Sequence, residues 1–279
     1  MDESFNSLHI SGVAVVLGSA VVAALRWGLL LHLQGLRFKV AVVLRWTLIC
    51  EFFGLTLPGG AGTELARAYY MFRSAPNAKT AALSSIILDR VLAMTSLILM
   101  GFLSFLALYL TSDTVDETIM VFGTVMGAVL FGTILGFILI GFRPVRRLIQ
   151  MPLPQKHKDV VDNIITSYTG GKMVLLQSFA LSFAAHTFIL FAFFISAEIL
   201  STPVGWEALA IAMPLAMISN ILPITPAGIG VGETTAAFVF ALFGISNGAT
   251  IMLVSRIWFI AIQLLGGVIY LFHRHEEAG

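Results

Sequence analysis

The sequence predicts an all-α polytopic membrane protein with about five full transmembrane helices and two inverted re-entrant helical hairpins. Apolar residues make up 58% of the 279 residues and charged residues only 11%, whereas a soluble domain carries about 25% charged residues. The mean hydropathy is +0.95. Two proline- and glycine-rich breaks interrupt the apolar sequence. We therefore expect residues 1–279 to form a single integral membrane domain.

Five apolar runs reach the length of roughly 20 residues that a membrane-spanning helix needs. These predicted spans are residues 10–33, 81–110, 118–141, 173–200 and 248–272. Arg26 lies near the end of the first run, about 24 Å along a helix that rises 1.5 Å per residue. We expect its side chain to reach the far interface beside Trp27.

Two further segments are each broken in the middle, and their pieces are too short to span. The first consists of 40–57 and 63–72, and the second of 207–222 and 232–244. Irregular backbone in hydrocarbon must pack against protein or line a wet cavity. Two such breaks in corresponding halves indicate a transporter's binding site. The predicted break residues are Pro58, Gly59, Gly60, Gly62, Pro223, Pro226, Gly228, Gly230 and Gly232.

The distribution of charge predicts the orientation. Residues 143–172 carry six Lys or Arg against two Asp, and residues 111–118 carry three acidic residues and no basic one. Because basic loops stay in the cytoplasm, 143–172 is predicted to be a cytoplasmic linker. The N-terminus is then outside and the C-terminus cytoplasmic, in the cell (cytoplasmic or inner) membrane. The two hairpins enter from opposite sides, which predicts an inverted repeat of 40–110 and 207–272.

Each break is followed by a glutamate in the first turn of a half-helix, Glu64 and Glu233. A favourable helix dipole contributes about 0.3–1 kcal/mol, while a charge in hydrocarbon costs about 2.5–3.5 kcal/mol. Each glutamate therefore needs an arginine, a proton or a hydrated cavity. We expect pairing with Arg90 and Arg256, within or across the repeats. Such glutamates could be proton-coupling sites, or gates that hold the arginines until a phosphate competes.

The arginines are the better candidates for binding a headgroup, because the planar guanidinium donates two parallel hydrogen bonds to phosphate. Arg67 lies one turn after Glu64 on the same helical face. Asp89 points about 100° away from its neighbour Arg90, so we expect these two to pair poorly. Asn220 could donate to a substrate or cap loose backbone. The predicted substrate-binding and translocation residues are Glu64, Arg67, Asp89, Arg90, Asn220, Glu233 and Arg256.

Two other polar residues lie deep in apolar sequence. Glu51 could line a cavity, and His186 is either a hydrogen-bonded structural histidine or a proton shuttle. The sequence has no HExxH or DxD-type cluster and one cysteine, Cys50. We therefore predict no metal, no cofactor and no enzymatic activity. The net charge of +1 provides no basic field for nucleic acid.

Two segments, 57–69 and 223–233, carry a family resemblance together with Leu88-Asp89-Arg90 and Arg256. They resemble the transmembrane, flippase-like family of lysylphosphatidylglycerol synthases, related to the membrane domain of multiple peptide resistance factors. The resemblance implies movement of lipids between leaflets, with a lipid-modifying synthase as a possible partner. Two positions depart from the family pattern: Ala227 replaces a glycine, and Asp89 replaces an expected glutamate. We expect no aminoacyl-transfer domain within residues 1–279, so the resemblance does not imply synthase activity.

The predicted function is that of a lipid flippase or translocase, which moves an anionic or aminoacylated phospholipid, or a lipid-linked headgroup, between leaflets. One alternative is a transporter of a small soluble ion or solute. Another is an intramembrane lipid-modifying enzyme that uses Glu64, Asp89 and His186. A third is a passive scaffold for a partner synthase.

Overall fold

Ten α-helices and no strand form the part of the chain that the computed structural model describes, residues 2–140, 142 and 154–278. Five helices are long: α1 (Asp2–Leu33), α4 (Lys79–Thr111), α5 (Glu117–Ile140), α8 (Lys172–Ile199) and α11 (Gly248–Ala278). Each contains an apolar stretch long enough to cross a membrane. The prediction of an all-α polytopic membrane protein with five spans is confirmed.

Four helices are short and form two hairpins. They are α2 (Val40–Gly54), α3 (Ala61–Ser74), α9 (Trp206–Ser219) and α10 (Val231–Ala241). A 15-residue helix is about 22 Å long, whereas the hydrocarbon core is about 30 Å thick. The partners α2 and α3 pack against each other, as do α9 and α10. Each pair therefore folds back on itself instead of crossing.

The turns of the two hairpins, residues 55–60 and 220–230, are here called the tips, and they contact each other. Pro58 and Pro226 form an isolated antiparallel bridge. Gly59 has a φ of +63°, and a Cβ atom at this position would lie 2.6 Å from the carbonyl oxygen of Ile221. Glycine is required here both for its left-handed backbone and for the close approach of the opposite tip. The irregular backbone is thus packed against protein, as its position in an apolar sequence demands.

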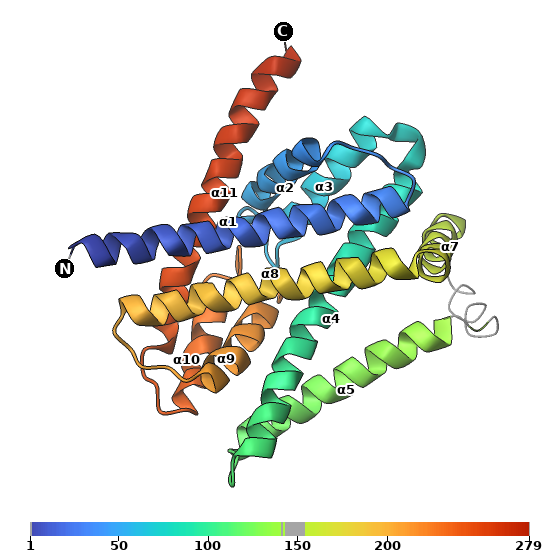
Figure 1. The fold of residues 1–279 in the computed structure, drawn as a ribbon. Coiled ribbons are helices and arrows are strands. Elements are labelled where there is room, and N and C mark those ends of the chain that lie inside the picture. Colours follow the sequence, from blue (N-terminus) through green and yellow to red (C-terminus); the bar gives the residue numbers. More distant parts are fainter. Residues whose placement is uncertain (1, 141, 143–153, 279) are drawn as a thin grey trace.

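The order long, short, short, long occurs twice along the chain, in α1 to α4 and in α8 to α11. The first helices of these two sets, α1 and α8, run antiparallel and pack along most of their length (Figure 1). Helix α5 packs on α4 and extends away from the rest of the bundle in this view. In Figure 1 the hairpin α2–α3 lies above, and the hairpin α9–α10 below, the region where Pro58 and Pro226 meet.

The predicted linker 143–172 is described only in part, because residues 143–153 lie outside the described residues. Its later part forms α7 (Gln155–Gly170), which packs on α4. The 3₁₀ turn Pro76–Ala78 joins α3 to α4.

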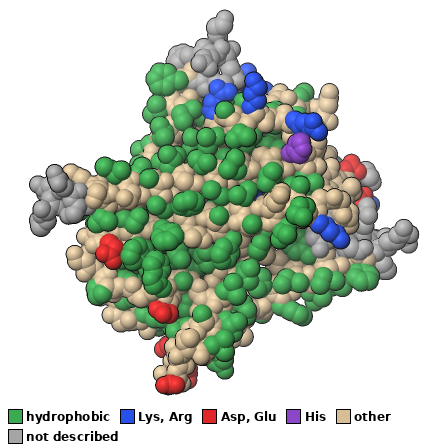
Figure 2. Space-filling view, viewed as in Figure 1, with side chains coloured by type: hydrophobic (Ala, Val, Ile, Leu, Met, Phe, Trp, Pro, Cys, Tyr) green, Lys and Arg blue, Asp and Glu red, His purple; other side chains and the backbone are tan. Residues whose placement is uncertain are grey.

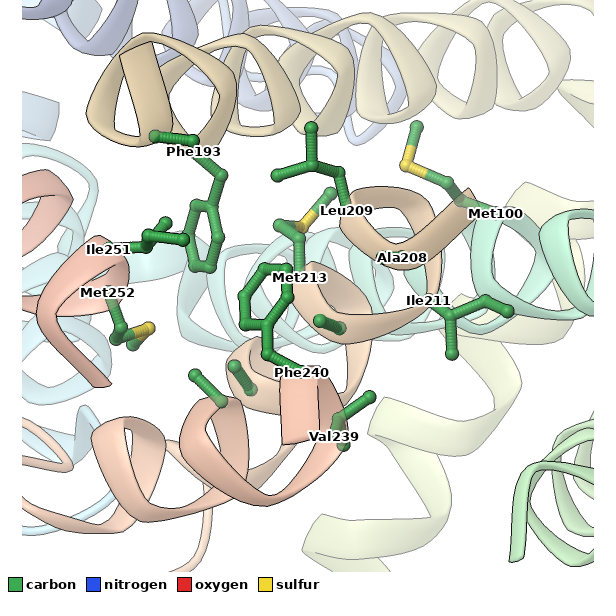
Figure 3. Packing of buried hydrophobic residues seen from close by; sticks show 14 of the residues in the cluster. Met100, Phe193, Ala208, Leu209, Ile211, Met213, Val239, Phe240, Ile251 and Met252 are labelled. Carbon is green, nitrogen blue, oxygen red and sulfur yellow. The ribbon is translucent and has the colours of Figure 1, made fainter. Parts of the chain in front are cut away.

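The largest buried apolar cluster surrounds the second hairpin (Figure 3). Phe193 of α8, Met213 of α9 and Phe240 of α10 are fully buried there. Much of the outer surface is apolar, as a lipid-facing surface requires (Figure 2). On the face shown, Lys and Arg lie in the upper and right-hand parts, and most visible Asp and Glu lie at the lower left.

Candidate functional site

A buried cluster of three charged side chains lies beneath the first hairpin. The guanidinium of Arg26 donates from Nε to Oδ1 of Asp89 (2.6 Å) and from Nη2 to Oδ2 (2.9 Å). Arg67 donates from Nη1 to the same Oδ2 (2.7 Å), and its guanidinium carbon lies 4.8 Å from the ring centre of Trp27. Helices α1, α3 and α4 are thereby joined by one carboxylate between two arginines.

The position of Arg26 corrects the expectation that it reaches the far interface beside Trp27. Its side chain is buried, and its third donor, Nη1, bonds to Oγ of Ser182 on α8 (3.1 Å). Distance along a single helix suggested an interfacial residue. Helices α3, α4 and α8 instead surround this part of α1 and supply Arg26 with a counter-charge. The prediction that Asp89 and Arg90 pair poorly is confirmed, because Asp89 bonds to Arg26 and Arg67 instead. Neither of these two partners was predicted from the sequence.

Glu64 and Arg90 form a loose ion pair at the tip of the first hairpin. Arg90 Nη1 lies 3.6 Å from Glu64 Oε1, and the side chains are 39% and 26% exposed. Arg90 Nη2 also donates to the carbonyl of Gly59 (3.2 Å). Oε2 of Glu64 has no hydrogen-bond partner among the described residues. The predicted pair is present within its own repeat, but the two charged groups are far apart for an ion pair and both remain partly exposed.

The corresponding pair of the second hairpin, Glu233 and Arg256, is tight. Arg256 donates from Nε to Oε1 of Glu233 and from Nη2 to Oε2 (3.1 Å), and the side chains are 10% and 14% exposed. The remaining contacts of Arg256 go to the carbonyl of Ala227 (2.9 Å), Oδ1 of Asn220 (3.1 Å) and the carbonyl of Gly228 (3.3 Å).

These contacts fix the backbone of the second tip. Oε2 of Glu233 accepts from the amide of Gly230 (2.8 Å), which satisfies a free backbone N–H at the start of α10. Asn220 was expected to donate to a substrate or to cap backbone; in the structure its side-chain oxygen accepts from Arg256. The glutamate thus satisfies both a helix N-terminus and an arginine.

A polar cavity of about 330 Å³ lies where the first hairpin meets α1, α4, α8 and the second tip. Five of the predicted site residues line it: Glu64, Arg67, Asp89, Arg90 and Asn220. Arg256 lines an adjoining, smaller and mainly apolar cavity of about 130 Å³. The structure thus brings five of the seven predicted residues to one cavity from segments far apart in the sequence, whereas Arg256 lines the adjoining cavity and Glu233 lines neither of the two.

Residues outside the predicted set also line the polar cavity. Glu51 lies in it, as its depth in the sequence suggested, and Arg26 and His186 join it there. All three also line a neighbouring cavity of about 190 Å³. Nδ1 of His186 is 3.0 Å from Oγ of Ser96, which is the contact of a hydrogen-bonded structural histidine.

The charges of the polar cavity balance. Three arginines (Arg26, Arg67, Arg90) face three carboxylates (Glu51, Glu64, Asp89). Within the described residues there is no group of three or more His, Cys, Asp or Glu side chains that could hold a metal ion. Guanidinium groups in a space of low dielectric are suited to binding an anionic group.

Comparison with known proteins identifies the family but adds no characterised relative. Searches of curated proteins and of solved structures return no match. The family model described as "Lysylphosphatidylglycerol synthase TM region" matches residues 3–268, nearly the whole chain and both hairpins. The protein is therefore a member of the lysylphosphatidylglycerol synthase transmembrane family.

Proposed function

We propose that this protein moves a phospholipid with an anionic headgroup between the leaflets of the membrane, and that Arg90 makes the first contact with the phosphate. The headgroup passes through the polar cavity while the acyl chains stay in the surrounding lipid. Membership of a membrane family named for a lipid synthase supports a lipid-related role. A synthase that modifies the lipid would be a natural partner for such an activity.

The observation that carries the proposal is that Arg90 is only loosely paired and partly exposed. Arg26 and Arg67 are committed to Asp89, and Arg256 is committed to the second tip. Arg90 holds Glu64 only at 3.6 Å and remains 39% exposed at the edge of the cavity. A phosphate can displace a weak, partly hydrated ion pair at small cost. The fork of the guanidinium then binds it with two hydrogen bonds.

The contact between the tips supports a gating role for the hairpins. The bridge between Pro58 and Pro226 lies next to the cavity, which is lined by Gly59, Ile221 and Ala227. A headgroup that crosses the bilayer has to part these tips or pass beside them. Rocking one helix set against the other would expose the cavity to each side in turn.

The orientation of the chain is part of the proposal. Basic residues on 143–172 and near the first hairpin favour a cytoplasmic location for that side, with the N-terminus outside and the C-terminus inside. The α4–α5 connection, with Asp113, Asp116 and Glu117, then faces outward.

Leaflet-resolved scrambling in proteoliposomes tests the proposal. The probe is phosphatidylglycerol with a fluorescent acyl chain, whose outer-leaflet pool is bleached by an impermeant reductant. We expect the wild type to exceed empty vesicles and Arg90→Ala to be slower by about tenfold or more, because a hydrogen bond to a charged group contributes about 1.5–3 kcal/mol. Arg37→Ala is the matched control, since Arg37 is exposed in the α1–α2 connection and lines no part of the polar cavity.

Three results would count against the proposal in different ways. A wild-type rate equal to that of empty vesicles excludes lipid movement. Equal rates for the wild type and Arg90→Ala remove Arg90 from the headgroup site. Uptake of a water-soluble phosphate ester without any lipid movement would instead identify a transporter of soluble anions.

A further inference from the structure

Glu51 is the carboxylate of the polar cavity that lacks an arginine. It lies on α2, three residues before the end of that helix at Gly54, and borders both the polar cavity and the neighbouring cavity of about 190 Å³. Among the described residues, no hydrogen bond joins its side chain to another group, and no ion pair reaches it within 4.0 Å. Glu64, Asp89 and Glu233 all have such partners.

Among the described residues, the charges around the cavity that could neutralise Glu51 lie on α1, α3, α4 and α8. The titratable and charged groups that face it are Arg26 on α1, Glu64 and Arg67 on α3, Asp89 and Arg90 on α4, and His186 on α8. Helix α11 contributes Gln263, which carries no charge. The three arginines already hold Asp89 and Glu64, and His186 bonds to Ser96.

The charge of the cavity therefore depends on one proton. With Glu51 ionised, three arginines meet three carboxylates, and a phosphodiester headgroup would bring an uncompensated negative charge into the membrane. With Glu51 protonated, the empty cavity carries one positive charge, and the occupied cavity is neutral. Neutral occupancy is strongly favoured where the dielectric constant is low.

We infer that Glu51 is a proton-binding site whose proton accompanies the anionic headgroup through the cavity. The inference rests on the proposed movement of lipid and names its coupling ion. One proton from the water on one side and one headgroup with a single negative charge enter together. Both leave on the other side, so no net charge crosses and Glu51 returns to its ionised state. A pH gradient would then set the direction of net lipid movement.

Proteoliposomes with a pH-sensitive dye in the lumen and fluorescent phosphatidylglycerol in the membrane test this inference. For the wild type, an imposed pH gradient is expected to produce lipid asymmetry between the leaflets, together with a matching change in lumenal pH. Glu51→Gln removes the titrating group at nearly constant shape. We expect it to abolish both the gradient-driven asymmetry and the lumenal pH change.

Two further variants separate titration at Glu51 from other effects. Glu51→Asp keeps a carboxylate in the cavity and is expected to retain coupling. His186→Gln removes the imidazole that also lines the cavity, and a loss of coupling in this variant together with retained coupling in Glu51→Gln would move the proton site to His186. Thermal unfolding of each purified variant in detergent shows that a loss of coupling does not reflect a loss of fold.

The outcomes separate this inference from the proposed function. If the wild type scrambles lipid but Glu51→Gln responds to the pH gradient as the wild type does, the proton site is wrong and lipid movement stands. The same holds if a sodium gradient, and no pH gradient, drives the asymmetry. If the wild type moves no lipid at all, both the proposed function and the inference fail.

Discussion

The two hairpins have one sequence pattern and two different states of their ion pairs. Each has a proline- and glycine-rich tip, a glutamate in the first turn of the helix after it, and an arginine in the next long helix. In the first hairpin, Glu64 and Arg90 are 3.6 Å apart and partly exposed to the cavity. In the second, Arg256 is bound to Glu233 and to three acceptors on residues of its own tip. The same pair is loose and partly exposed to the cavity in one half, whereas in the other half it is tight and holds the backbone of its own tip.

The residues beside each pair explain the difference. Counting from the glutamate, the position of Arg67 corresponds to that of Ala236, and counting from the arginine, that of Asp89 corresponds to Ser255. Asp89 bonds to Arg26 of α1, whereas the hydroxyl of Ser255 bonds to Ser196 of α8 (2.9 Å). The first half thus places charges where the second half places small neutral groups. This asymmetry places the polar cavity on the side of the first hairpin.

The largest expected effect concerns Asp89 and Ser255, which directly precede the arginines of the two pairs. Asp89→Asn leaves Arg26 and Arg67 buried together without a counter-charge, and loss of one partner of a buried ion pair costs about 3–5 kcal/mol of unfolding free energy. Ser255→Ala, at the corresponding position, removes one neutral hydrogen bond worth about 1 kcal/mol. Equilibrium unfolding in detergent compares the two. Equal losses would show that the halves are stabilised in the same way.

The ion pairs themselves should give an intermediate effect. Arg256→Ala leaves the poorly exposed Glu233 without its cation and is expected to reduce the unfolding free energy by about 2–3 kcal/mol. Arg90→Ala breaks a loose pair that solvent partly screens, with a loss of at most about 1 kcal/mol. The same unfolding measurement applies. A larger loss of unfolding free energy for Arg90→Ala than for Arg256→Ala would show that the pair of the first hairpin is the tighter one.

The smallest expected effect concerns the contact between the tips. Gly59 and Gly60 both have positive φ, +63° and +75°, so alanine at either costs about 1–2 kcal/mol in backbone strain. A methyl group on Gly59 would also lie 2.6 Å from the carbonyl oxygen of Ile221 on the opposite tip, whereas one on Gly60 would lie 3.7 Å from Arg90 Nη2. We expect Gly59→Ala to be less stable than Gly60→Ala by about 1 kcal/mol. Equal stabilities would mean that the contact between Gly59 and Ile221 on the opposite tip does not contribute to stability.

The spans and the breaks could be predicted from the sequence because they depend on local properties. Apolar runs of sufficient length define five helices regardless of what packs on them. Proline and glycine before Glu64 and Glu233 mark the ends of short helices, and the structure begins α3 and α10 within two residues of the predicted starts. The pairs of these glutamates with Arg90 and Arg256 were also predictable, since a carboxylate in hydrocarbon needs a compensating group.

The tertiary structure alone decided which charges are satisfied and which are available. Arg26 and Asp89 are 63 residues apart, and nothing in either helix indicates that they meet. Glu51 could be placed in a cavity by its depth, but its lack of a partner depends on Asp89 and Glu64 having taken the arginines. The state of each ion pair is set by the side chains that four or five packed helices bring together, and local sequence does not encode that packing.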